Sequence, residues 1–198
     1  MYRNMTKLAG LALLVLAACV GAPVPEVTSM ALFEGEVAVQ TPNGYCIDTQ
    51  TSRARAGFVV IAGCASVVDD INRKTMPGIV TVQLGEPGTA LVEGGESELK
   101  AFLGSAEGRT LLGAQPAKLD AKNGRVEVYF NDGGEFPVAG MQPDEWRAFV
   151  DVAGRLVTLR IRASVSVPIS ADQAQTLLNA AISGLQAKAA EPAQNING

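Results

Sequence analysis

The chain of 198 residues contains no histidine. This absence excludes Ser-His-Asp triads, Cys-His dyads, zinc sites built on histidine and haem held by histidine. Basic residues are also scarce, because 16 Lys and Arg stand against 20 Asp and Glu, for a formal net charge of −4. Nucleic-acid binding needs a clustered basic face, so we expect no nucleic acid as a partner.

The apolar run near the N-terminus, Leu8–Ala18, is shorter than the about 20 residues that a membrane-spanning helix needs. Arg3 and Lys7 precede it, and small residues end it. A positive start, a short apolar run and small residues are typical of an export signal. Translation from Met5 is an alternative, and it would leave Lys7 as the only basic residue of this signal.

The end of this run, Leu16-Ala17-Ala18-Cys19, resembles the lipobox of bacterial lipoproteins. The resemblance implies cleavage between Ala18 and Cys19, a diacylglyceryl group on the Cys19 thiol and acylation of its new amino group. Val20 stands where an Asp would mark retention at the inner membrane, so the resemblance implies an outer membrane lipoprotein that faces the periplasm. The lipid bilayer would then be a partner through acylated Cys19. An ordinary secretory signal, with Cys19 incidental, is the alternative.

The composition along the chain predicts four segments. Residues 1–18 form the signal peptide, and 19–35 hold the lipidated cysteine and a tether with two prolines near its start. A single domain follows over 36–190, and 191–198 lack any pattern and are predicted to be a disordered tail.

Two cysteines remain in the predicted domain, Cys46 and Cys64. An even pair in an exported domain predicts a disulfide, and the segments around both cysteines have the pattern of neighbouring strands. Closing this loop would stabilise the fold by roughly 3 kcal/mol. Free buried thiols are an alternative, whereas thiol chemistry is disfavoured because the chain has no histidine base and no Cys-x-x-Cys pair.

Hydrophobic periodicity predicts an α+β fold with a largely antiparallel sheet of about six strands and three helices packed on it. The predicted strands are 36–41, 56–63, 79–84, 118–121, 125–130 and 155–165. The turn Asn123-Gly124 predicts a hairpin. Of the helices, the first covers 96–103, and the last follows a capping box from Ser170 to Gln173.

The middle helix is predicted to begin at Pro143 and to end at Gly154. Two acidic residues after the proline suit the opening turn of a helix. Trp146, Phe149 and Val150 have the spacing of a buried helical stripe.

The layout of strands and helices resembles the PsbP-type α/β/α sandwich, chiefly through a long strand that leads to a C-terminal helix. The segments Gly44–Asp48, Phe58–Cys64, Trp146–Phe149 and Gly154–Thr158 also resemble lipoproteins of alphaproteobacteria. That family carries no settled activity, so the resemblance implies none.

Ser97 and Lys100 match the Ser-x-x-Lys motif of penicillin-recognising enzymes. The partner motifs are missing, so Ser97 is interpreted as a helix cap and Lys100 as a solvated residue. A cell-envelope hydrolase that uses Ser97 and Lys100 is nevertheless the alternative function.

Arg160 and Arg162 lie on one face of the last predicted strand, where they form a candidate anion-binding pair or a solvent-exposed face. No pattern predicts a metal site or a cofactor. The sequence therefore predicts a membrane-anchored accessory that acts by binding or assembly with an envelope protein, and that is not an enzyme.

Overall fold

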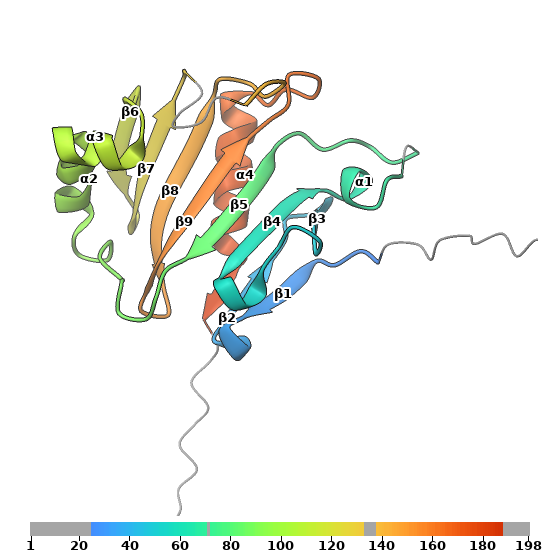
Figure 1. The fold of residues 1–198 in the computed structure, drawn as a ribbon, viewed down its shortest axis with the longest axis horizontal. Helices are drawn as coiled ribbons and strands as arrows, with labels where there is room; N and C mark the ends of the chain where they lie inside the picture. Colours follow the sequence, from blue (N-terminus) through green and yellow to red (C-terminus); the bar gives the residue numbers. More distant parts are fainter. Residues whose placement is uncertain (1–24, 71, 133–137, 188–198) are drawn as a thin grey trace, which may run out of the picture.

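The computed structural model describes residues 25–70, 72–132 and 138–187, and it contains two sheets (Figure 1). Its strands are β1 (Ser29–Leu32), β2 (Val37–Gln40), β3 (Tyr45–Ile47), β4 (Phe58–Gly63), β5 (Ile79–Leu84), β6 (Lys118–Lys122), β7 (Arg125–Phe130), β8 (Glu145–Val152), β9 (Arg155–Arg162) and β10 (Leu185–Ala187). Seven strands form the main sheet in the order β3-β4-β5-β9-β8-β7-β6, and every neighbouring pair is antiparallel. The small sheet has the order β1-β2-β10.

The helices of the described residues cover parts of the main sheet. They are α1 (Cys64–Val67), α2 (Glu96–Gly104), α3 (Ala106–Leu112) and α4 (Ala171–Ser183), with 3-10 turns η1 (Phe33–Gly35) and η2 (Ala54–Ala56). In Figure 1, α4 crosses behind the main sheet, whereas α2 and α3 lie at its β6–β7 end. The predicted α+β class, with a large antiparallel sheet, is confirmed.

Two hydrophobic cores lie on opposite faces of the main sheet. The larger core joins α4 and the small sheet to the central strands, and Leu159 and Leu178 are fully buried in it. The smaller core joins α2 and α3 to β7 through residues such as Leu103 and Phe130. On this second face α2 contacts β6 and β7, whereas Ile79 of β5 is 38% exposed. Part of the second face therefore stays open.

The middle helix predicted from Pro143 to Gly154 is wrong, because Glu145–Val152 is strand β8. Trp146 and Val150 point into the larger core, whereas Phe149 packs against the smaller core. Charged and apolar residues alternate along β8 except at Phe149, which is apolar because the smaller core covers it. This exception gives Trp146, Phe149 and Val150 the spacing of a helical stripe. Gly154, predicted to end the helix, instead lies with Ala153 in the tight turn between β8 and β9.

The hairpin predicted at Asn123-Gly124 is confirmed. Both residues have positive φ, 52° and 70°, and they join Lys122 to its pairing partner Arg125. A two-residue turn with this backbone matches the twist of the strands that it connects.

The capping box before α4 is also confirmed. The Ser170 side chain accepts from the Gln173 backbone, and the Gln173 side chain accepts from the Ser170 backbone. The break between α2 and α3 falls at Ser105, whose hydroxyl accepts from the backbone of Gly108. Gly108 itself lies inside α3.

The folded part of the chain begins before residue 36, the predicted start of the domain. Ser29–Leu32 is strand β1, and the Val27 carbonyl accepts a hydrogen bond of 2.7 Å from the Ile47 backbone. The predicted signal peptide (1–18) and tail (191–198) lie outside the described residues. Within the described part of the chain, the helices are all too short or too polar to cross a membrane.

Candidate functional site

A cluster of four charged side chains lies on the second face of the main sheet, at the β8–β9 pair. Glu145 and Arg147 are two residues apart on β8, and Arg160 and Arg162 are two residues apart on β9. Arg147 pairs directly with Arg160 across the two strands. Because side chains two residues apart in a strand share a face, this register brings all four together.

Glu145 is the centre of the cluster, and it is fully buried. Arg160 donates from Nε to Oε1 at 3.0 Å and from Nη2 to Oε2 at 3.1 Å. Arg147 donates from Nε to the same Oε1, and Nε of Arg162 lies 3.6 Å from Oε2. A buried carboxylate is tolerated only where opposite charges and donors surround it, so the three arginines explain why Glu145 stays inside the fold.

Arg147 joins this cluster to the smaller core. Its guanidinium carbon lies 4.6 Å from the centre of the Phe130 ring, and Nη1 donates to the Leu112 carbonyl at 3.2 Å. The face of the aromatic ring attracts the cation. The hydrogen bond to Leu112 gives a donor to a carbonyl at the C-terminal end of α3. The cluster is thus held by β7, β8, β9 and α3 together.

A cavity of about 250 Å³ opens beside the cluster, lined by Ile79, Thr81, Met141, Arg160 and Arg162. The two arginines predicted as a candidate anion-binding pair therefore line one cavity. Arg160 keeps 31% of its side chain exposed, so its guanidinium reaches solvent. Guanidinium groups in a small cavity can bind a carboxylate or a phosphate.

Glu145 and Arg147 were missed as site residues by the sequence analysis. Their alternation with Trp146 and Ala148 is a two-residue period, which indicates a strand with charges on one face. The helical spacing of Trp146 and Phe149 concealed this signal.

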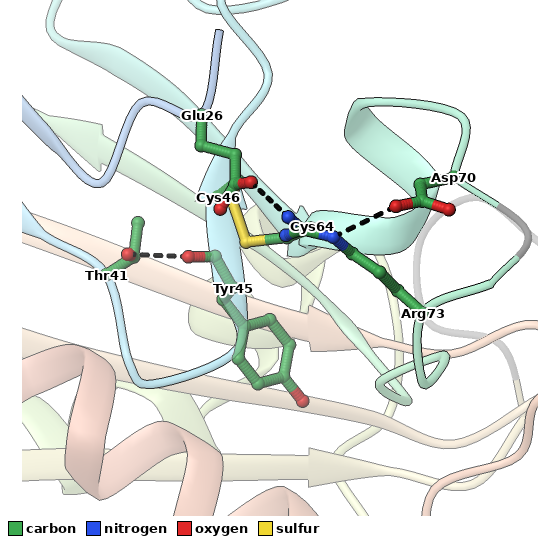
Figure 2. Close-up of a disulfide and its surroundings, with 7 residues drawn as sticks. All are labelled: Glu26, Thr41, Tyr45, Cys46, Cys64, Asp70 and Arg73. Atoms are coloured by element: carbon green, nitrogen blue, oxygen red, sulfur yellow. Dashed lines mark hydrogen bonds and ion pairs between the residues drawn. A yellow bond between two sulfur atoms is a disulfide. The ribbon is translucent and has the colours of Figure 1, made fainter.

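The predicted disulfide between Cys46 and Cys64 is present, with a Cα–Cα distance of 4.8 Å (Figure 2). Cys46 lies in β3, as expected, whereas Cys64 begins α1 directly after β4. The antiparallel pairing of Tyr45 with Gly63 brings the two cysteines close together. Since both sulfurs are bonded to each other, neither is a nucleophile or a metal ligand in this structure.

A second cavity, of about 660 Å³, lies beside the disulfide, and Cys64 lines it. Arg73 borders this cavity and forms ion pairs with Glu26 at 2.5 Å and with Asp70 at 3.1 Å (Figure 2). These pairs join the N-terminal segment to the loop after α1. Because all three side chains are substantially exposed, the pairs contribute little to stability.

A third cavity, of about 370 Å³, lies between α4 and the β7–β8 pair, with Tyr129 and Trp146 in its wall. The two ring centres are 5.4 Å apart. The Tyr129 hydroxyl donates to the Asp144 carboxylate, and this hydrogen bond is the main reason why the pKa of Tyr129 is raised to about 12. Burial and the charge of Asp144 raise the pKa further.

We expect Tyr129 to ionise near pH 12 in the folded protein. The neutral phenol is the hydrogen-bond donor, so this contribution to stability is complete below the ordinary tyrosine pKa of about 10 and is lost as pH rises towards about 12. The measurement is absorbance at 295 nm from pH 9 upwards, compared with Tyr129→Phe, while circular dichroism monitors folding. A difference between the two titrations centred on the ordinary tyrosine pKa would contradict the prediction.

Ser97 and Lys100 are both exposed on α2, and neither lines the cavities described above. The predicted role of Ser97 as a helix cap is wrong, because Gly95 occupies the N-cap position and Ser97 is the second residue of the helix. Ala18 and Cys19, the predicted cleavage and lipidation site, lie outside the described residues.

Comparison with known proteins gives a fold but no family. No family model matches the chain, and no curated protein matches it. Among solved structures, the Ran-binding protein Mog1p of Saccharomyces cerevisiae has a TM-score of 0.50 at 10% identity, over 80% of this chain and 94% of Mog1p. The PsbP protein of the cyanobacterium Synechocystis has a TM-score of 0.44 at 14% identity, over 87% of this chain and 98% of that protein. A PsbP protein is thus among the structural neighbours, and the likeness to Mog1p shows a common fold.

Proposed function

We propose that the chain is a bacterial envelope lipoprotein, anchored through acylated Cys19 to the outer membrane with its α+β domain in the periplasm. The observation that carries the proposal is the sequence Leu16-Ala17-Ala18-Cys19 directly after a short apolar run. Several acyl chains, at about 0.8 kcal/mol per buried CH₂, hold a folded domain at a bilayer without a spanning helix.

The disulfide supports export. Disulfides form and persist in oxidising compartments such as the bacterial periplasm, and the cytosol keeps thiols reduced. The Cys46–Cys64 bridge is part of the fold, where it joins β3 to the start of α1. In an exported protein this bridge would stay oxidised, because the periplasm does not reduce it.

We further propose that the domain acts by binding or assembly with an envelope partner. A protein of the same fold, Mog1p, is named for binding Ran, so this fold can present a protein-binding surface. The hydrolase alternative has less support, because Ser97 and Lys100 are solvent-exposed and the partner motifs of penicillin-recognising enzymes are missing. An acylating β-lactam or fluorophosphonate probe that labels Ser97 would favour the hydrolase instead.

The test of the anchor is labelling with radioactive palmitate in growing cells. We expect label in the wild-type protein, and no label but an unprocessed precursor in Cys19→Ser. The matched control is the double variant Cys46→Ser/Cys64→Ser, which keeps Cys19 and should be labelled like the wild type. Label that persists in Cys19→Ser, or a wild-type protein that keeps its first 18 residues, would refute the proposal.

A further inference from the structure

We propose that the cavity beside Arg160 binds a carboxylate group that is carried by an apolar molecule or side chain. This inference names a ligand class for the binding function proposed above, and it rests on that function for its biological role. The site itself is defined by the β5 and β9 residues that line the cavity and by Glu145 beneath them.

The donors of Arg160 are the first argument. A guanidinium group has five N–H donors in a planar arrangement. Arg160 uses one from Nε and one from Nη2 on Glu145. The end of the guanidinium, formed by Nη1 and the second hydrogen of Nη2, has no acceptor among the residues that the structure describes. Two parallel N–H donors on one edge match the two oxygens of a carboxylate.

The second argument is that Glu145 fixes the position of Arg160. Glu145 is fully buried, and it holds the Arg160 guanidinium through both of its oxygens. A free arginine on a surface loses rotamer freedom when it binds a ligand. Arg160 has already lost much of this freedom in the fold, so a ligand would bind to a group that is in place. Glu145 is therefore a positioning residue for the site.

The other walls of the cavity select the rest of the ligand. Ile79 is 38% exposed and lines the cavity together with Met141 and Thr81. An exposed isoleucine and a flexible methionine offer apolar contact to a short hydrocarbon group. The volume of about 250 Å³ lies below the range of about 300–1,000 Å³ for drug-sized ligands, so the apolar part is small. Arg162 adds a second positive charge to the wall.

The experiment is an NMR titration of the full chain, purified in a nonionic detergent, with butanoate at constant ionic strength. We expect saturable shifts of the Arg160 Nε–H signal and of the methyl signals of Ile79 and Met141. Acetate should bind more weakly than butanoate, because it lacks the apolar group. Neutral butanamide should produce no saturable shift, and methylphosphonate should bind more weakly than butanoate.

Variants separate the proposed contacts from general charge effects. We expect Arg160→Gln to weaken butanoate binding by about tenfold or more, since the charged fork is lost. Arg160→Lys keeps the positive charge beside Glu145 but removes the two parallel N–H donors. It should therefore also weaken butanoate binding. The matched control is Arg55→Gln, an exposed arginine of η2 that is not part of the cavity lining.

Three results would overturn the inference. They are equal binding of butanamide and butanoate, unchanged affinity in both Arg160 variants, and the absence of any saturable shift in the millimolar range. Tighter binding of methylphosphonate would reassign the site to phosphate groups. None of these results depends on Cys19, so failure of this site and failure of the lipid anchor, tested by palmitate labelling, are distinguishable.

Discussion

Replacement of Glu145 by glutamine is expected to lower the free energy of unfolding by roughly 3–5 kcal/mol. Glu145 is fully buried, and its carboxylate contacts the guanidinium groups of Arg147, Arg160 and Arg162. Glutamine has nearly the same shape but no charge, so three cations would remain close together in a partly desolvated place. Urea unfolding, followed by circular dichroism, measures the change as a lower midpoint.

The matched control is Glu107→Gln, which removes the same charge from an exposed position on α3. Substitutions at such surface positions usually change stability by less than about 0.5 kcal/mol. If Glu145→Gln unfolds at the same urea concentration as Glu107→Gln, the charge cluster does not stabilise the fold as we expect.

Loss of the disulfide is expected to lower the free energy of unfolding by roughly 3 kcal/mol. Cys46 and Cys64 are 18 residues apart, so the bridge closes a loop of moderate length in the unfolded chain. The reduced unfolded chain gains conformational freedom, whereas β3 and β4 remain paired in the folded state. Urea unfolding with and without a reducing agent measures the difference.

The variant Cys46→Ala/Cys64→Ala supplies the control for this measurement. Its midpoint should resemble that of the reduced wild type, and the reducing agent should not change it. A wild-type midpoint that stays the same after complete reduction, verified by thiol titration, would show that the bridge adds no stability.

Local signals in the sequence predicted several elements correctly. The Asn123-Gly124 turn and the capping box at Ser170 depend on interactions within four residues of chain, so the sequence contains all of the information. The apolar face of α4 is likewise a local pattern, and Leu177 and Leu178 on this face are buried.

Contacts between distant segments were the source of the errors. Whether Trp146 and Phe149 lie on one helical stripe or on opposite faces of a strand depends on what covers each face of β8. One face of β8 is covered by α4, and the other is covered by the core of α2 and α3. Both of these elements are separated from β8 along the sequence. A local pattern contains no information about this cover.

In the candidate site, too, some features follow from the sequence alone and others only from the tertiary structure. The sequence by itself placed Arg160 and Arg162 on one strand face, because side chains of a strand alternate whatever its neighbours are. Only the tertiary structure decided that Glu145 lies buried beneath them, because that contact requires the pairing of β8 with β9. Pairing partners and burial are set by packing of the whole chain, whereas turns, caps and periodicity are set by neighbours along it.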